Sequence, residues 1–274
     1  MKIVSWNVNG IRSVLGKGFL NWLTETNPDI VCLQETKICE RDLDEHVPAF
    51  PGYASYWYAA ERSGYSGVAV LSKFEPLNVT RGIGQTAYDR EGRIITVEYE
   101  NLFVVNVYAP NAQMEYVRLP FRLAWEETLR AYLTELQKKK PLILCGDLNV
   151  AHTPADVGIG DDSGFPGCSP DEREAFDQLL GIGLIDTFRF LHPTVRSYSW
   201  WAYANNARDW NQGLRFDYLL ASTVLQPTLR FAATHRDVLG SDHGPVSLEL
   251  AHEPGNTKPI HAPSLPSGQF GFSL

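Results

Sequence analysis

The stretch "PLILCGDLNVAH", residues 141–152, decides the fold class of this chain. Its run 142–145 is continuously apolar, which is typical of a strand that is buried on both faces of a sheet. Asp147 and Asn149 follow at the end of that run, and side chains two residues apart on a strand point to the same face. The pattern therefore predicts a sheet protein with polar groups gathered where a buried strand ends.

Apolar runs of strand length recur along the chain, and several of them are β-branched or aromatic. They are residues 3–8, 30–33, 67–71, 94–97, 103–108, 142–145, 216–220 and 246–250. Helical patterns open at Phe19, cover residues 119–136 and cover residues 172–180, where Ser169 and Pro170 fit an N-cap and a first turn. Strand follows strand over residues 94–108, so the order favours an α/β fold of two packed sheets with outer helices over simple βαβ winding.

The composition limits the class of protein. The chain has 274 residues, 44% hydrophobic and 20% charged, which suits one large domain or two small ones. A net charge of −8 argues against a general nucleic-acid coat protein, but not against an enzyme that meets phosphates through a bound cation. No apolar run approaches the ~18 residues of a membrane span, and no signal peptide is visible. With four cysteines in no metal-type spacing, these features predict a cytoplasmic protein without a membrane partner.

Polar side chains stand at the ends of six of the predicted strands. They are Asn7 and Asn9, Glu35, Tyr108 and Asn111, Asp147 and Asn149, Asp217, and Asp242 with His243. Buried polar groups without partners are costly, so a set of them on neighbouring strand ends is better explained as a site.

Each residue alone also has a simpler structural explanation. Asn7 and Asn9 suit a turn, Glu35 can pair with Lys37 at the surface, and Asp147 can form an Asx-turn. The remaining explanations are a core residue for Tyr108, half of a structural ion pair for Asp217, and a loop cap for His243. The combination favours a site, because six independent strand ends seldom carry such residues by chance.

The chemistry of the set points to phosphate. Carboxylate and carboxamide oxygens are ligands for a hard cation such as Mg²⁺, whereas the single histidine disfavours zinc. A carboxylate can activate water, and a histidinium with an amide can stabilise a phosphorane-like transition state. The residues therefore predict metal-assisted phosphodiester hydrolysis.

Six motifs carry a family resemblance. They are "WNVNGIR", "LQETK", "YAPN", "CGDLNVAH", "LRFDYLLAS" and "GSDHGPV", in this order over residues 1–250. The chain resembles the exonuclease III / class II AP endonuclease family. The resemblance implies a four-layer α/β sandwich of the DNase I-like superfamily over residues 1–251. It also implies Mg²⁺-dependent incision of DNA 5′ to abasic sites, with 3′-phosphodiesterase and 3′–5′ exonuclease activities.

The resemblance also implies which residues bind the metal. Glu35 would be the principal ligand, aided by Asn7, Asn9 or Asp242, with Mn²⁺ as a substitute for Mg²⁺. The position of Asn9 is aspartate in some members of the family, which puts its metal role in doubt.

Five residues take catalytic roles by resemblance. Asp147 would orient or deprotonate the attacking water, and Asn149 would support that geometry. Asp217 would hold His243, which contacts the scissile phosphate, and Tyr108 would reach the same phosphate.

The resemblance also implies a DNA-binding surface for an otherwise monomeric enzyme. Its partner is double-stranded DNA with abasic or 3′-blocked sites, and Asn111 and Arg215 are candidate DNA contacts. Trp200, Leu214 and Phe216 match an apolar pocket that admits a sugar without its base, whose flipping costs least when no pair is broken. The alternative is that these aromatic residues belong to the core.

The loop of residues 156–168 departs from the family pattern, and one alternative function also stays open. Residues 156–168 are acidic where some relatives carry a basic loop, and Asp161 and Asp162 would repel phosphates. DNA affinity is therefore expected either to be weak or to depend strongly on salt and Mg²⁺. The alternative function is another phosphodiesterase of the superfamily, such as a non-specific DNase, which lacks the "SWWAY…GLRF" segment in this form.

The C-terminal residues 252–274 are rich in proline and glycine and are predicted to be a mobile tail. The tail ends in "SGQFGFSL", with Gln269, Phe270, Phe272 and Leu274. This pattern resembles peptides that dock on bacterial sliding clamps. The alternative is that the segment packs back on the catalytic domain.

Overall fold

The computed structural model describes residues 1–160, 162–251 and residue 255. The predicted clamp-docking residues Gln269, Phe270, Phe272 and Leu274 lie outside this part, as does most of the predicted tail. No helix within the described ranges is long and apolar enough to cross a membrane.

The first of two large sheets has six strands in the order β13-β14-β1-β2-β4-β3. Their bounds are β1 Lys2–Asn7, β2 Ile30–Gln34, β3 Ala54–Tyr58, β4 Val68–Ser72, β13 Leu229–Thr234 and β14 Val246–Leu250. β1 and β2 run parallel, and the other neighbouring strands are antiparallel. The sheet is therefore mixed, as the sequence predicts.

The second large sheet also has six strands, in the order β5-β6-β7-β8-β12-β9. Their bounds are β5 Asn78–Arg81, β6 Ile94–Glu98, β7 Phe103–Tyr108, β8 Leu142–Asp147, β9 Leu184–Asp186 and β12 Asp217–Ser222. Only β7 and β8 are parallel among these pairs. Both sheets thus place one parallel pair at their centre, and each pair ends on residues of the predicted site.

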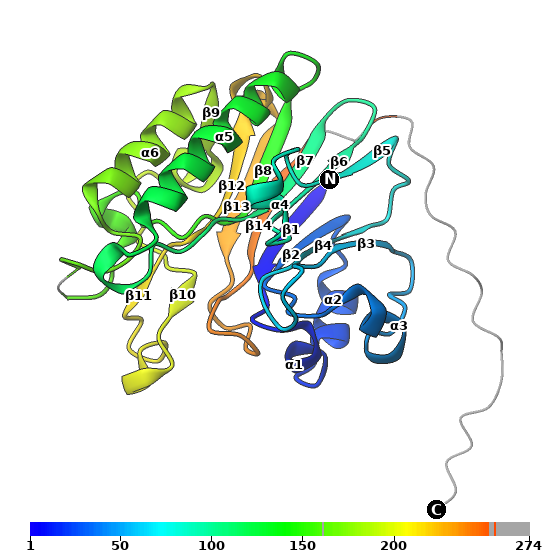
Figure 1. The fold of residues 1–274 in the computed structure, drawn as a ribbon, viewed down its shortest axis with the longest axis horizontal. Coiled ribbons are helices and arrows are strands. Elements are labelled where there is room, and N and C mark those ends of the chain that lie inside the picture. Colours follow the sequence, from blue (N-terminus) through cyan, green and yellow to red (C-terminus); the bar gives the residue numbers. More distant parts are fainter. Residues whose placement is uncertain (161, 252–254, 256–274) are drawn as a thin grey trace, which may run out of the picture.

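The two sheets pack face to face, and helices cover their outer faces (Figure 1). The helices are α1 Ile11–Leu15, α2 Phe19–Thr26, α3 Leu43–His46, α4 Thr86–Asp89, α5 Leu119–Gln137, α6 Pro170–Gly181 and α7 Thr187–Leu191. α1 and α2 lie on the first sheet, and α5 and α6 lie on the second. The four-layer α/β sandwich expected from the family resemblance is confirmed.

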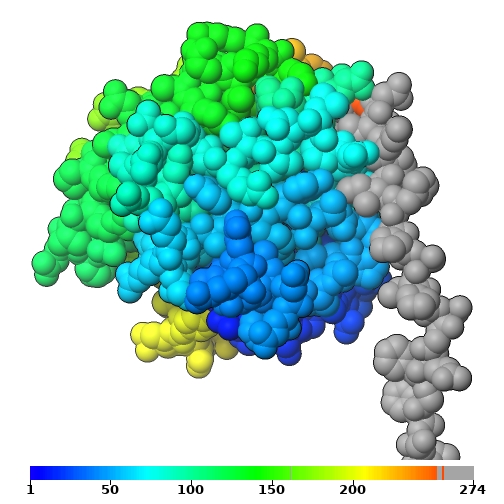
Figure 2. Space-filling view, turned by 45° about the vertical axis from the view of Figure 1, so that its right-hand side comes forward, coloured from blue at the N-terminus to red at the C-terminus, as the bar shows by residue number. Residues whose placement is uncertain are grey.

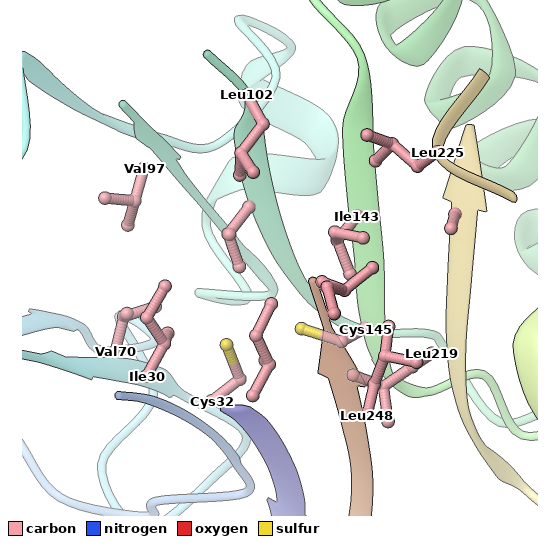
Figure 3. Packing of buried hydrophobic residues seen from close by; sticks show 14 of the residues in the cluster. Ile30, Cys32, Val70, Val97, Leu102, Ile143, Cys145, Leu219, Leu225 and Leu248 are labelled. Atoms are coloured by element: carbon pink, nitrogen blue, oxygen red, sulfur yellow. The ribbon is translucent and has the colours of Figure 1, made fainter. Parts of the chain in front are cut away.

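The continuous apolar runs are explained by burial on both faces of each strand. On β2, Ile30 and Cys32 point between the sheets, while Val31 and Leu33 face the helices of the first layer. On β8, residues 143 and 145 point inward and residues 142 and 144 face α5 and α6. Figure 3 shows Ile30 and Cys32 packed with residues of the opposite sheet in this central core. A strand between two apolar layers needs no polar alternation.

The start of helix α6 agrees with the sequence prediction. Ser169 caps α6 in a capping box, in which its hydroxyl accepts from the backbone of Glu172 and the Glu172 carboxylate accepts from the backbone of Ser169. Pro170 occupies the first turn, as expected.

A two-stranded hairpin stands apart from both large sheets. It is formed by β10 Trp200–Trp201 and β11 Gly213–Leu214. It projects from the end of the sandwich where α1 lies (Figure 1), and Figure 2 shows this yellow segment protruding from the molecular surface. The aromatic segment singled out in the sequence is therefore an appendage beside the strand ends.

Candidate active site

The site begins with two turns of the same kind at the ends of the central strands. The backbone N–H of Asn9 donates to the side chain of Asn7 (3.0 Å), and that of Asn149 donates to Asp147 (2.9 Å). Asn9 and Asn149 have left-handed backbones, with φ of 46° and 50°. The strands end at Asn7 and Asp147, so Asn9 and Asn149 lie beyond them and strand alternation does not place the two members of each pair on one face, contrary to the sequence prediction. The Asx-turns bring the members of each pair together instead.

Close packing of β7 on β8 explains the glycine before Asp147. Gly146 has φ of 144°, and a Cβ on it would lie 1.8 Å from the carbonyl oxygen of Val107. Only glycine permits that approach. The turn that carries Asp147 is therefore fixed against the neighbouring strand that ends at Tyr108.

Asn7 joins two carboxylates from different sheets. Its amide nitrogen donates to Glu35 Oε1 (2.9 Å) and to Asp147 Oδ2 (2.8 Å). Lys37 lies 2.8 Å from the other oxygen of Glu35, so the surface pair expected as the simpler explanation also forms. Burial alone would raise the pKa of Glu35, but Lys37 and Asn7 outweigh it and hold the pKa below its usual value. Glu35 is thus a carboxylate at neutral pH.

A buried histidine lies between two aspartates. His243 Nδ1 is 2.8 Å from Asp217 Oδ2, and its Nε2 is 3.8 Å from Asp147 Oδ2. Burial lowers the pKa of His243, but the carboxylates of Asp217 and Asp147 outweigh this effect and raise it to about 10. The ring is therefore an imidazolium at neutral pH.

Asp147 has the opposite balance. Its pKa is raised to about 7, because burial and the nearby charges of Asp217 and Glu35 oppose the carboxylate more than His243 favours it. A carboxyl group that exchanges its proton near neutral pH is suited to general base catalysis.

The carboxamides behind Asp147 hold its position. Asn149 donates to the carbonyl oxygen of Ala109 (3.0 Å) and accepts from Asn111 (2.9 Å). Arg122 is fully buried in α5 and donates to the carbonyl oxygens of Leu148 and Asn149, both at 2.7 Å. The backbone of the turn is therefore fixed from a helix.

Tyr108 lies under an arginine at the rim of the same site. The guanidinium of Arg93 lies 4.6 Å from the centre of the Tyr108 ring and donates to its carbonyl oxygen (3.0 Å). Burial and the Glu35 carboxylate raise the pKa of Tyr108 well above its usual value, although Arg93 opposes them. Tyr108 keeps its proton at neutral pH and offers a hydrogen-bond donor.

One group of side chains could hold a metal ion. Ligand atoms of Glu35, Asp147 and His243 lie within 4.8 Å of one another. The two carboxylates fit a hard cation, whereas the protonated imidazole does not ligate a metal.

The structure does not bring the other predicted metal residues into that group. Asn7 turns its amide nitrogen to the carboxylates and its oxygen to the backbone of Asn9. Asn9 and Asp242 hydrogen-bond to each other (2.8 Å). In this arrangement the amide nitrogens of Asn7 and Asn9 donate to carboxylates, and the metal-binding role expected for both residues stays a prediction.

An open pocket of about 430 Å³ adjoins these residues. Its polar side is formed by the catalytic candidates described above, and its apolar side by Phe165, Pro166, Trp200, Phe216 and Met114. Trp200 stacks on Phe216 with ring centroids 5.6 Å apart, and Phe165 contacts the same indole. Leu214 is fully buried and packs in the same apolar cluster behind the pocket. Trp200 and Phe216 thus line the open pocket, and Phe216 also belongs to the buried cluster behind it.

Arg215 does not face this pocket, which corrects its expected contact with DNA. Its side chain is 2% exposed and forms ion pairs with Asp156 (2.7 Å) and Asp186 (2.6 Å). Arg189 also pairs with Asp156, at 2.6 Å. A buried guanidinium with two carboxylate partners fixes the hairpin to the sandwich and is not free to bind phosphate.

The acidic loop carries less free charge than its sequence indicates. Asp156 is buried in the ion cluster with Arg215, and Asp162 pairs with Arg173 at 2.7 Å. Asp161 lies outside the described residues. The expected repulsion of phosphates by this loop is therefore weaker at two of its positions.

Three contributors to the site were missed in the sequence. Phe165 and Pro166 line the pocket, and an apolar pair inside a glycine-rich polar loop was the available signal. Arg122 was the third, and its signal was a charge within the apolar stripe of the long helix, three residues before Trp125.

Comparisons with known proteins agree with this geometry. The sequence model of the Endonuclease/Exonuclease/phosphatase family matches residues 4–243. The chain is 48% identical to an exodeoxyribonuclease of Bacillus subtilis over 90% of this chain and 98% of that protein. It is 47% identical to the DNA repair nuclease APEX1 of Danio rerio, over 92% of this chain and 82% of that protein.

Solved structures of nucleic-acid-processing enzymes also resemble this chain. The AP endonuclease of Leishmania major superposes with a TM-score of 0.85 at 29% identity, covering 92% of this chain and 88% of that one. A 3′ phosphatase from Neisseria, bound to a product DNA hairpin, superposes with a TM-score of 0.79 at 28% identity. That match covers 91% of this chain and 99% of the other.

Proposed function

Because this chain belongs to the endonuclease/exonuclease/phosphatase family, in its exonuclease III and AP endonuclease branch, we propose that it incises duplex DNA 5′ to abasic sites. The same site would remove 3′-blocking groups and digest 3′ ends, since relatives are named as 3′ phosphatase and exodeoxyribonuclease. The observation that carries the proposal is the Asp147–His243–Asp217 array opening onto an aromatic-walled pocket.

The residues have complementary roles in phosphodiester hydrolysis. Asp147 takes a proton from the attacking water as the water oxygen bonds to phosphorus. The bond from phosphorus to the 3′ oxygen breaks, and the 3′ oxygen takes a proton from solvent to leave as a hydroxyl. The imidazolium of His243, held by Asp217, stabilises the negative charge that develops on the phosphoryl oxygens. Tyr108 donates a further hydrogen bond to that phosphate, and Asn149 keeps Asp147 in line.

Glu35 is the principal residue that would hold a divalent metal, and Mg²⁺ is the proposed ion, with Mn²⁺ as a substitute. When bound, the ion supplies positive charge that polarises the phosphate. Asn7 fixes the carboxylates of Glu35 and Asp147 through one amide group, so the metal ligand and the general base keep a set separation.

The aromatic pocket supports abasic sites as the preferred substrate. An extrahelical sugar without a base is small and has few polar groups, and its flipping breaks no base pair. Trp200, Phe216 and Phe165 offer an apolar surface of suitable size beside the catalytic group. A non-specific DNase would have no need of this pocket, so the observation favours the repair activity.

The test is incubation with a duplex that contains one tetrahydrofuran abasic analogue, with Mg²⁺ or with EDTA. We expect one cut immediately 5′ to the analogue, and only with Mg²⁺. Cleavage spread along the intact strands would favour a non-specific DNase instead.

Three further proposals concern the protein in the cell. We place it in the cytoplasm, since Cys32 and Cys145 are buried free thiols of the core. We propose that it acts as a monomer. Docking of the C-terminal segment on a sliding clamp stays a prediction, and titration of a peptide of residues 264–274 against the clamp would test it.

A further inference from the structure

We propose that Asp242 is a positioning residue for specificity, which orients the indole of Trp200 in the pocket. The inference rests on the proposed function. It assigns Asp242 as the residue that holds Trp200, in the wall of the pocket, at a fixed position relative to His243. It follows from the contacts of one carboxylate.

Both oxygens of Asp242 are engaged by the protein. Oδ1 accepts from the amide of Asn9 (2.8 Å) and from the hydroxyl of Ser241 (3.2 Å), and Oδ2 accepts from the indole Nε1 of Trp200 (3.1 Å). Asp242 therefore faces the pocket wall with one oxygen and the first sheet with the other.

The polarity of this contact chain has only one arrangement. Lys37 donates to the Asn9 oxygen and carries no acceptor, so the Asn9 nitrogen must face Asp242. A carboxylate carries no donor, so Trp200 must donate to it. A continuous chain of polar contacts thus leads from the metal-binding carboxylate to the pocket, through Glu35, Lys37, Asn9, Asp242 and Trp200.

The indole needs such a partner to hold one orientation. Trp200 is half-buried and stacks on Phe216, but stacking alone permits the ring to slide or rotate in its plane. The hydrogen bond to Asp242 fixes the edge of the ring that faces the catalytic residues, and both residues line the pocket. A hydrogen bond to a charged acceptor is stronger than one between neutral groups.

The backbone supports the same pairing. Residue 200 and residue 243 form an isolated bridge between the hairpin and the segment before β14, and the N–H of Trp201 donates to the carbonyl oxygen of Asp242 (3.0 Å). The hairpin is therefore docked on the loop that carries both Asp242 and His243. An orienting contact at this junction acts on the pocket and the imidazolium together.

The first experiment reads the hydrogen bond without any activity. In ¹⁵N-labelled full-length protein, each of the seven tryptophans gives one indole N–H signal, and Trp200→Phe identifies the signal of Trp200 by its loss. We expect Asp242→Ala to shift that signal and to speed its hydrogen exchange about tenfold. Asp237→Asn, an exposed aspartate of the same loop, is the matched control and should change neither.

A second variant separates orientation from loss of charge or of fold. Asp242→Asn alone sets two amide nitrogens against each other, because Asn9 already presents its nitrogen. Combining it with Asn9→Asp reverses donor and acceptor, so that Lys37 and Trp200 both keep an acceptor. We expect the double exchange to restore the Trp200 signal, which a general structural defect would not allow.

The second experiment measures specificity as the ratio of abasic-site incision to digestion of an intact 3′ end. We expect Asp242→Ala to lower this ratio roughly fivefold to tenfold, with no further loss when Trp200→Phe is added, because residues that act through one contact are not additive. An unshifted indole signal, or a ratio that falls by the product of the two single effects, would overturn the inference. If the wild-type protein cuts neither substrate, the proposed function fails, and the specificity role fails with it.

Discussion

The buried ion cluster of Asp156 with Arg215 makes a quantitative prediction for Asp156→Asn. One oxygen of Asp156 lies 2.7 Å from Arg215 Nε and 2.6 Å from Arg189 Nη2. The other accepts from the backbone (2.9 Å) and the hydroxyl (2.8 Å) of Thr153. The substitution preserves the shape of the side chain but removes its charge and leaves Arg215 with Asp186 alone. We expect it to lower the free energy of unfolding.

The pKa of Asp156 gives the magnitude. Burial alone would raise this pKa, but Arg215 and Thr153 lower it to about 2. Compared with ~3.9 in the unfolded chain, this shift corresponds to about 2.6 kcal/mol of stability at pH 7. For a chain of this length, such a loss lowers Tm by roughly 5 °C.

The same shift fixes the pH dependence and its sign. Because the folded-state pKa is depressed, the contribution of Asp156 is fully present above the unfolded value of ~3.9 and is lost as pH falls through about 2. The difference between the wild-type protein and Asp156→Asn should therefore be constant from pH 8 to pH 5. It should shrink by about 0.7 kcal/mol at pH 3.5.

The assay is urea unfolding followed by tryptophan fluorescence at each pH, with Asp237→Asn as an exposed control that changes stability by less than about 0.5 kcal/mol. A loss below about 1 kcal/mol at pH 7 would refute the assignment of Arg215 to a structural cluster. A difference that keeps its full size at pH 3.5 would refute the role of the Asp156 charge.

Three predictions concern the proposed reaction. Glu35→Gln should raise the Mg²⁺ concentration needed for half activity, since a carboxylate ligand is lost, and activity in excess EDTA would contradict the metal site. Asp147→Asn and His243→Ala should each lower the rate of incision by ~10² or more with the circular dichroism spectrum unchanged, and wild-type rates would remove them from the mechanism. Phe216→Ala or Trp200→Ala should reduce cleavage at an abasic analogue more than digestion of an intact 3′ end; equal losses would return both residues to the core.

The central strands could be predicted because burial on both faces of a sheet requires mainly apolar residues. The five strands β1, β2, β7, β8 and β12 are buried on both faces, so each is mainly apolar and carries a polar residue at one end. The edge strand β5, with the sequence NVTR, is mostly exposed and carries no apolar run. Its strand structure comes from pairing with β6, which local sequence does not encode.

Long-range partners explain where the site prediction failed. Arg215 stands in an aromatic segment next to a pocket, so its local sequence suits a DNA contact. Its actual partners, Asp156 and Asp186, are 59 and 29 residues away in the chain. The buried Arg122 is similar, because it donates to the carbonyl oxygens of Leu148 and Asn149, which lie 26 and 27 residues further along. Charge and position in sequence do not reveal such pairings before the fold is known.

Asn7 forms a turn at the end of β1 and also positions two carboxylates of the site. As the first residue of an Asx-turn, Asn7 accepts from the backbone of Asn9 with its oxygen, and this fixes the direction of its amide nitrogen. That nitrogen then donates to Glu35 and to Asp147, which come from different sheets. A turn that ends a strand thereby sets the separation of two carboxylates across the sandwich. An aspartate in place of Asn7 would keep the turn and lose both donors, so the choice of asparagine reports the site and the turn together.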